Sequence, residues 1–246
     1  MISLRHIIKI YEGGTDEHAL GDVSLDIPDG DVFGIIGISG AGKSTLVRCI
    51  NLLERPTSGS VIVDGTDVTN LSGAALRSYR RRVAMIFQGF GLLAQKTALE
   101  NVCFPFRAST GHVTKENRER ARALLDEVGL ADKAGSYPAQ LSGGQQQRVA
   151  IARALACEPE YILCDEATSA LDPEWVGEVL QVMHSIAEDG MTMMVVSHEM
   201  RFVRSIATRV VYLDEGKVLE DGTPDQVFNH PRTKEARRFL GQAHLT

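Results

Sequence analysis

Short continuous apolar runs recur along this chain of 246 residues, and their length is typical of buried β-strands. Two earlier segments, 2–11 and 20–27, are also predicted to be strands, but they mix apolar with polar residues. From Val23 to Ile27 the two kinds alternate, as expected for a strand with one exposed face. Buried strands are predicted at residues 32–36, 83–87, 161–164 and 192–197, and a hairpin at 209–214 and 217–221.

Segments whose apolar residues recur at helical spacing lie between most of these strands. The first helix follows the strand at 32–36, where apolar residues recur at helical spacing from Leu46 to Ile50. Another starts at Pro173, because proline suits the first turn of a helix. Between residues 89 and 159 the pattern is helical only. Strands that alternate with helices predict an α/β fold with a mostly helical insert. Further helices are predicted near 73–80, 121–128 and 233–240. A short helix is predicted to start at Thr223-Pro224, with Thr223 as its cap and Pro224 in its first turn.

A glycine-rich stretch joins the first buried strand to the first helix. It reads Gly37-Ile38-Ser39-Gly40-Ala41-Gly42-Lys43-Ser44-Thr45 and fits the pattern Gly-x-x-x-x-Gly-Lys-Ser in full. Such glycines let backbone N–H groups point at phosphate oxygens, and the helix adds its positive N-terminal end. Lys43 can reach the β- and γ-phosphates, and the Ser44 hydroxyl can coordinate Mg²⁺. An ordinary glycine turn is the alternative, but it does not require Gly-Lys-Ser at this spacing.

Two acids follow the strand at 161–164. A buried strand that ends in Asp165-Glu166 is the second half of a P-loop site. Asp165 would hold Mg²⁺, directly or through water, and Glu166 would orient and polarise the attacking water. The alternative is a pair of solvated acids at a strand end, which has little weight beside a complete phosphate loop.

Polar residues also follow two other buried strands. Gln88 stands after the strand at 83–87, where it can contact an ion or a water, or merely face solvent. His198 ends the strand at 192–197, and a lone histidine there is most often structural. Together with Asp165 they are expected at one edge of the sheet, because ligands of open α/β sheets bind at the carboxyl ends of the strands.

A second candidate anion site lies inside the helical insert. Ser142-Gly143-Gly144-Gln145 precedes an apolar helix face, and Ser142 can cap that helix. The turn exposes N–H donors at a positive helix end, so beside the first phosphate loop it predicts a phosphate contact. Tyr11 could stack on an adenine ring, although a residue on a strand surface is the simpler interpretation.

Composition narrows the class of protein. The net charge of −6 provides no overall basic field for nucleic acid or anionic lipid, and the basic run at 77–82 is interpreted as a solvated helix end. The four cysteines are scattered without metal-ligand spacing, which favours reduced thiols. We find no signal peptide and no apolar run long enough to span a bilayer, so a membrane role would depend on a partner.

Together these motifs resemble the nucleotide-binding subunit of ATP-binding-cassette (ABC) transporters over nearly the whole chain. The resemblance implies one ABC ATPase domain over residues 1–246, with a P-loop NTPase (RecA-like) core and an antiparallel β subdomain. That core would occupy 1–88 and 160–246, and an α-helical subdomain would occupy 89–159. It also implies ATP and Mg²⁺ as ligands. Tyr11 matches the family's adenine-stacking residue, His198 would sense the γ-phosphate, and Asp172, in the loop 169–172, would link two sites across a dimer.

The strongest likeness is to bacterial importers of amino acids, especially methionine and polar amino acids. The cues are the segments 23–27, 51–56 and 90–105. Methionine importers usually carry a further C-terminal regulatory domain, so we expect the polar-amino-acid kind or a shortened form. The resemblance implies a head-to-tail homodimer, a membrane permease, an extracytoplasmic binding protein, and a peripheral place on the cytoplasmic face of the inner membrane.

Two other functions stay open within the same family. An exporter subunit carries the same cassette, because the direction of transport is determined by the permease. ABC ATPases of DNA repair or translation act without a membrane partner, but they usually add coiled coils or a second cassette. This chain has one cassette and no sustained heptads, so we expect no nucleic-acid partner.

Overall fold

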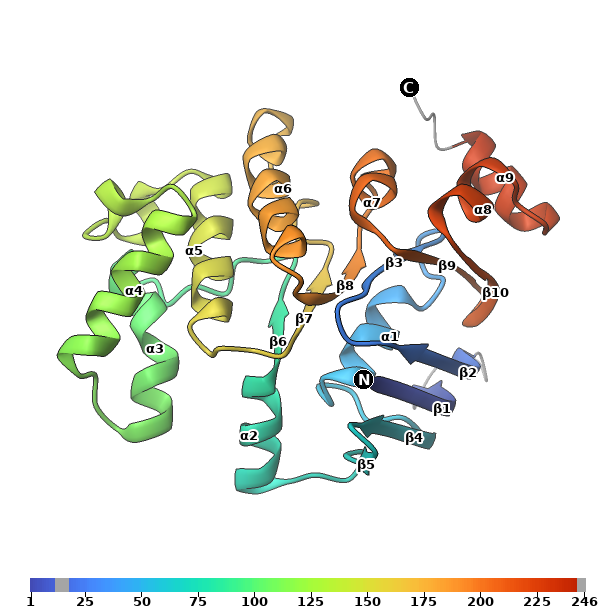
Figure 1. Cartoon of the computed structure of the whole chain (residues 1–246), viewed down its shortest axis with the longest axis horizontal. Helices are drawn as coiled ribbons and strands as arrows, with labels where there is room; N and C mark the ends of the chain where they lie inside the picture. Colours follow the sequence, from blue (N-terminus) through green and yellow to red (C-terminus); the bar gives the residue numbers. More distant parts are fainter. Residues whose placement is uncertain (12–17, 243–246) are drawn as a thin grey trace.

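The computed structural model describes residues 1–11 and 18–242. The described residues form two β-sheets, with helices packed around the larger one (Figure 1). That larger sheet has the strand order β10-β9-β3-β8-β7-β6, in which only β10 is antiparallel to its neighbour. Its strands are β3 (Val32–Ile36), β6 (Val83–Ile86), β7 (Tyr161–Asp165), β8 (Thr192–Val196), β9 (Arg209–Asp214) and β10 (Lys217–Gly222).

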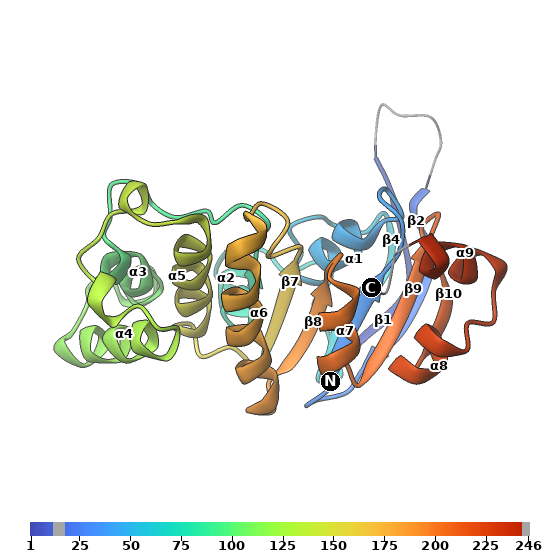
Figure 2. The same cartoon turned by 90° about the horizontal axis from the view of Figure 1, so that it is seen from above.

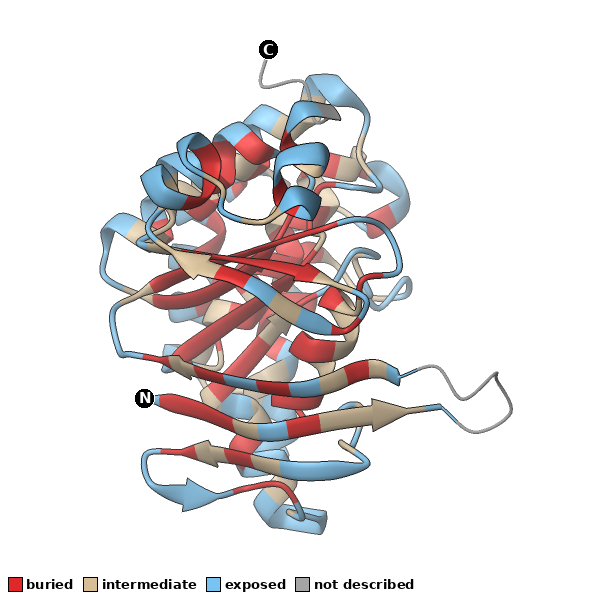
Figure 3. Ribbon diagram, turned by 90° about the vertical axis from the view of Figure 1, so that its right-hand side faces the viewer, coloured by how far each residue is buried: buried red, intermediate tan, exposed pale blue. Residues whose placement is uncertain are grey.

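The smaller sheet is antiparallel and has the order β2-β1-β4-β5. Figure 3 shows buried and exposed residues interleaved along its strands. This fits the mixed apolar and polar pattern of the sequence, since one face packs on the core and the other meets solvent. Its strands are β1 (Ile2–Ile10), β2 (His18–Ile27), β4 (Ser58–Val63) and β5 (Thr66–Asp67).

The helices fall into two groups in Figures 1 and 2. One group lies beside the larger sheet and consists of α1 (Lys43–Ile50), α2 (Gly73–Arg82), α6 (Pro173–Glu188), α7 (Met200–Ile206), α8 (Pro224–Asn229) and α9 (Lys234–Gln242). The other group stands apart, beyond β6, and consists of α3 (Ala98–Thr110), α4 (Lys115–Glu127) and α5 (Gly143–Leu155), with 3₁₀ turns at Ala131–Lys133 and Pro138–Gln140.

Polar caps define where several of these helices begin. A capping box pairs the residue before the helix with the third helical residue, so that two otherwise unpaired N–H groups are satisfied. The boxes are Thr97 with Glu100 for α3, Thr114 with Asn117 for α4, Ser142 with Gln145 for α5, and Thr223 with Gln226 for α8.

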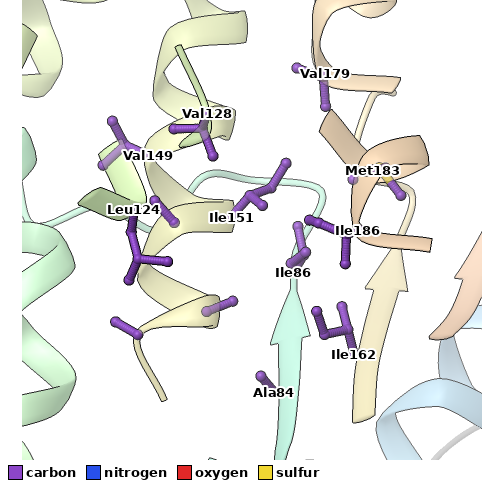
Figure 4. Packing of buried hydrophobic residues seen from close by; sticks show 14 of the residues in the cluster. Ala84, Ile86, Leu124, Val128, Val149, Ile151, Ile162, Val179, Met183 and Ile186 are labelled. Carbon is purple, nitrogen blue, oxygen red and sulfur yellow. The ribbon is translucent and has the colours of Figure 1, made fainter. Parts of the chain in front are cut away.

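A continuous apolar cluster joins the second helix group to the larger sheet. In Figure 4, Ile151 of α5 lies beside Ile86 of β6, and Met183 and Ile186 of α6 approach from the other side. A second cluster fills the space between the two sheets and includes Leu46 and Val47 of α1. The helix that carries the end of the phosphate loop is therefore anchored between both sheets.

The mixed α/β architecture predicted from the sequence is confirmed, but two details differ. Helix α7 was not predicted, since its seven residues are too few to display a clear helical period. The basic run is also less solvated than expected. Arg80 donates hydrogen bonds to the carbonyls of Asn51 and Leu52, and Arg82 forms ion pairs with Asp64 and Glu160. Among the described residues, no helix is long and apolar enough to cross a membrane.

Candidate functional site

The glycine-rich loop turns tightly between β3 and α1. Gly37 has a φ of 151°, and a Cβ there would lie 2.1 Å from the carbonyl oxygen of Leu213. Gly42 caps α1 in the left-handed region, with a φ of 98°, and its Cβ would lie 2.3 Å from the carbonyl oxygen of Ala19. Neither position has room for a side chain, so the loop keeps its backbone in contact with neighbouring strands.

Lys43 lies between this loop and two acids. Its ammonium donates hydrogen bonds to the carbonyl oxygens of Gly37 at 2.9 Å and Ile38 at 2.8 Å. Burial lowers the pKa of Lys43 below its ordinary value, while the carboxylates of Glu166 and Asp165 act in the opposite direction. The ammonium is thus a cation in a confined place, which suits contact with phosphate oxygens.

Asp165 ends β7 with its carboxylate fixed at both oxygens. The Ser44 hydroxyl donates to Oδ1 at 2.5 Å, and Arg48 of α1 forms an ion pair with Oδ2 at 3.1 Å. Asp165 is 2% exposed, so this carboxylate belongs to the interior. Hydroxyl and carboxylate oxygens are ligands that Mg²⁺ accepts, usually together with substrate phosphates and waters. No group of three or more His, Cys, Asp and Glu side chains in the described chain could hold a metal by itself.

Glu166 and His198 meet at the ends of neighbouring strands. Glu166 follows β7 with a φ of 52°, and its N–H donates to the carbonyl of Val196 in β8 at 3.0 Å. His198 follows β8 and donates from Nε2 to Oε1 of Glu166 at 3.0 Å. The left-handed backbone is held by the neighbouring strand and turns the Glu166 side chain toward His198.

Gln88 and Tyr11 flank the site on opposite sides. Gln88 is exposed just beyond β6, beside β7 in the sheet. The strands of Gln88, Asp165 and His198 are therefore adjacent and parallel, and their polar residues share one edge. Tyr11 follows β1 and is 43% exposed, with its hydroxyl 3.4 Å from that of Thr45. The ammonium of Lys9 lies 4.8 Å from the centre of the Tyr11 ring.

The second glycine turn lies at the start of α5. The Ser142 hydroxyl accepts from the Gln145 N–H at 3.3 Å, and the Gln145 side chain accepts from the Ser142 N–H at 3.1 Å. A Cβ on Gly144 would lie 2.8 Å from Cβ of Trp175 in α6, so the turn packs closely on that helix. Asp172 is exposed at the N-cap of the same helix. Figures 1 and 2 both place α6 and β7 between α5 and α1.

Three residues at the site escaped sequence reasoning. Arg48 contacts Asp165, while Gln147 and Arg153 of α5 donate to backbone carbonyls in residues 87–91. A signal existed for Gln147. The buried residues Gly144, Gln147, Ile151 and Ala154 recur at helical spacing, which places this glutamine on the inner face of α5.

Comparisons with known proteins agree on one family. The family model described as ABC transporter matches residues 20–169, more than half of the chain. The methionine import ATP-binding protein MetN of Mannheimia succiniciproducens is 51% identical over 243 residues, which are 98% of this chain and 70% of that protein. MetN of Caulobacter vibrioides is 51% identical over 244 residues, which are 99% of this chain and 73% of that protein.

Solved structures show the same fold. The dimeric structure of MJ0796, a bacterial ABC transporter cassette, has a TM-score of 0.82 and 39% identity, and covers 91% of this chain and 99% of that one. CbiO1 from Clostridium perfringens, part of the transporter complex cbiONQ, has a TM-score of 0.81 and 28% identity, and covers 99% of this chain and 95% of that one. The chain therefore belongs to the ABC transporter family, as an ATP-hydrolysing subunit.

Proposed function

We propose that this chain is the ATPase of a methionine importer, working as a homodimer with a membrane permease. The observation that carries the chemistry is the convergence of the phosphate loop, Asp165, Glu166, His198 and Gln88 at one sheet edge. The choice of methionine among amino acids rests on the MetN relatives, which match nearly the whole chain.

The phosphate loop and Lys43 bind the β- and γ-phosphates of ATP, and Tyr11 stacks on its adenine. Ser44, Asp165 and Gln88 would hold Mg²⁺, and the ion would supply positive charge against the phosphates. The contact between the Ser44 hydroxyl and the buried Asp165 carboxylate supports this assignment, because it brings two oxygen ligands to one point. Arg48 keeps the other oxygen of that carboxylate in place.

Glu166 polarises the water that attacks the γ-phosphate in line. Its hydrogen bond with His198 orients the carboxylate, and His198 also contacts the γ-phosphate. Positioning and charge supply most of the rate, since phosphoryl transfer demands little covalent chemistry from the protein.

A second copy of the chain completes each site. The signature segment, residues 142–145, lies at the start of α5, and in Figures 1 and 2 α6 and β7 stand between α5 and α1. In a head-to-tail dimer it covers the γ-phosphate of the partner, and Asp172 links the two sites. Each charge-assisted bond to that phosphate contributes about 1.5–3 kcal/mol. Losing a few of them on hydrolysis approaches the roughly 5.5 kcal/mol that reverses a 99:1 equilibrium.

The permease docks on the second helix group. Exposed Leu93 and Phe104 line a hollow there, together with the charged residues Lys96, Glu100, Arg107 and Arg118. Exposed apolar side chains among charged ones are typical of a protein-binding site. Docking holds the chain at the cytoplasmic face of the inner membrane, and an extracytoplasmic binding protein delivers the amino acid to the permease.

The test is to tag the chain, extract it gently from native membranes and identify what accompanies it. Recovery of a small integral permease, with ATPase activity in vesicles that rises when methionine and its binding protein are present, is the expected result. Stimulation by a polar amino acid alone would overturn the methionine assignment. Recovery of ribosomes, DNA or only non-membrane proteins would overturn transport while the ATPase assignment remained.

A further inference from the structure

Two side chains of α5 hold the backbone on both sides of Gln88. Gln147 donates from Nε2 to the carbonyl oxygen of Phe87 at 3.2 Å. Arg153 donates to the carbonyl oxygens of Gly91 at 2.7 Å and Phe90 at 3.1 Å. Gln88 itself is exposed between these anchored carbonyls. The segment 87–91 is therefore attached to α5 while the side chain of Gln88 stays available to a ligand.

Stability alone does not account for a glutamine at position 147. Its side chain is fully buried, and Oε1 has no hydrogen-bond partner in the part of the chain that the structure describes. A buried polar atom without a partner destabilises a fold, whereas an apolar side chain of similar length avoids that loss. The one bond that Gln147 makes to residues 87–91 is what distinguishes it from a methionine in the same place.

Arg153 is half-buried, and this also has an energetic cost. Desolvation lowers the pKa of its guanidinium, and its terminal nitrogens donate to backbone carbonyls rather than to an acid. Guanidinium donors in a fixed fork suit two carbonyls of one turn better than a flexible ammonium would. Two polar side chains of one helix thus converge on the same short segment.

Helix α5 connects this segment to the signature segment. Ser142 caps its N-terminus, and Gln147 and Arg153 follow within the next three turns. Its inner face packs on the sheet, where Ile151 lies beside Ile86 of β6 in Figure 4. A displacement of the signature segment is carried by a packed helix to the two polar contacts.

We propose that Gln147 and Arg153 are positioning residues that set Gln88 according to the place of the signature segment. The inference rests on the proposed function, in which Gln88 serves Mg²⁺ and residues 142–145 cover the ATP of the partner.

The test compares Gln147→Met and Arg153→Met with Arg148→Met. Arg148 is the matched control, because it lies on the same helix and donates to a backbone carbonyl, that of Val128, away from residues 87–91. Both test variants should bind ATP as the wild type does, yet lose about tenfold or more in kcat and need several-fold more Mg²⁺ for half-maximal activity. The control should leave the Mg²⁺ requirement unchanged, and Gln147→Met should melt no earlier than the wild type.

A double-mutant cycle separates this inference from the function on which it rests. Gln88→Ala alone should lower kcat, and adding Gln147→Met or Arg153→Met should lower it no further, because the contacts act through Gln88. Full additivity would overturn the positioning role while leaving Gln88 as assigned. If Gln88→Ala changes neither kcat nor the Mg²⁺ requirement, the proposed role of Gln88 fails, and this inference fails with it.

Discussion

At the scale of single residues, we expect turnover to depend most on Glu166, the proposed water-activating group. Its backbone is held in the left-handed region by the hydrogen bond to Val196, and its carboxylate is held by His198. Both contacts come from β8 or the residues after it, so the water-activating group is placed by a neighbouring strand. An amide of the same shape can accept the same hydrogen bond from His198 through its oxygen.

Glu166→Gln should therefore bind ATP normally and hydrolyse it about 10²- to 10⁴-fold more slowly, because an amide cannot accept a proton from water. Single-turnover hydrolysis measured beside equilibrium ATP binding separates the two effects. Hydrolysis near the wild-type rate would contradict the role given to Glu166.

Sequence reasoning found the residues whose spacing in the chain reflects their chemistry. Lys43 and Ser44 belong to one continuous pattern, and Asp165-Glu166 follow a recognisable strand. Arg48 and Arg153 were missed because their partners are distant in sequence, and no local pattern indicates which carbonyl or carboxylate a long side chain reaches.

At the scale of elements, two helical glycines have opposite roles. Gly144 starts α5 against Trp175, whereas a Cβ on Gly177 of α6 would meet nothing within 4 Å. The first is required by close packing between helices. The second only weakens the helix that contains it, since glycine loses more conformational freedom on folding than alanine does.

Gly144→Ala should destabilise the fold by about 1–3 kcal/mol through overpacking, and Gly177→Ala should stabilise it by about 0.5–1 kcal/mol. Urea unfolding of both variants beside the wild type measures the difference. Equal urea midpoints for the two variants would contradict the prediction, because Trp175 would then have moved to accommodate the methyl group of Gly144→Ala.

The ion pair of Arg82 with Glu160 joins the end of α2 to the start of β7. Hydrogen bonding from Arg82 lowers the pKa of Glu160 below its ordinary value. A depressed folded pKa gives a contribution that is present above the unfolded pKa and is lost as pH falls through the folded one. Because Glu160 is about half exposed, solvent screening keeps this contribution small.

From about pH 5 to pH 3, the wild type should lose melting temperature more steeply than Glu160→Gln. Thermal unfolding at a series of pH values checks this, with matched ionic strength because exposed pairs are screened by salt. Parallel curves for the two proteins would mean that the pair contributes nothing to stability.

Element prediction worked best where local chemistry and burial agree. The buried strands β3, β7 and β8 and the caps at Ser142 and Thr223 appear where the sequence predicts them. Helix α7 was missed because its seven residues are too few to display a clear period. No local pattern predicts the order of strands in the sheet either, since pairing across the sheet depends on contacts between distant segments.

At the scale of the whole molecule, one chain carries the two glycine turns that we propose bind phosphate, on separate parts of its fold. The phosphate loop lies between the two sheets, and the signature segment lies beyond β6 on a helix of the second group. The solved structures of the relative MJ0796 are dimeric. We expect this chain to form a dimer as well, with ATP held between the two turns of different copies.

The most direct measurement is sedimentation velocity of Glu166→Gln with ATP and Mg²⁺, with ADP, and without nucleotide. We predict dimers only in the sample that contains ATP and Mg²⁺. Adding the substitution Ser142→Arg should abolish these dimers without loss of ATP binding. Adding Ser78→Arg, on the exposed face of α2, is the matched control and should leave the dimer intact. Two results would contradict a site shared between two copies. One is that ATP-saturated Glu166→Gln stays monomeric at every protein concentration, and the other is that the dimers persist when Ser142→Arg is added.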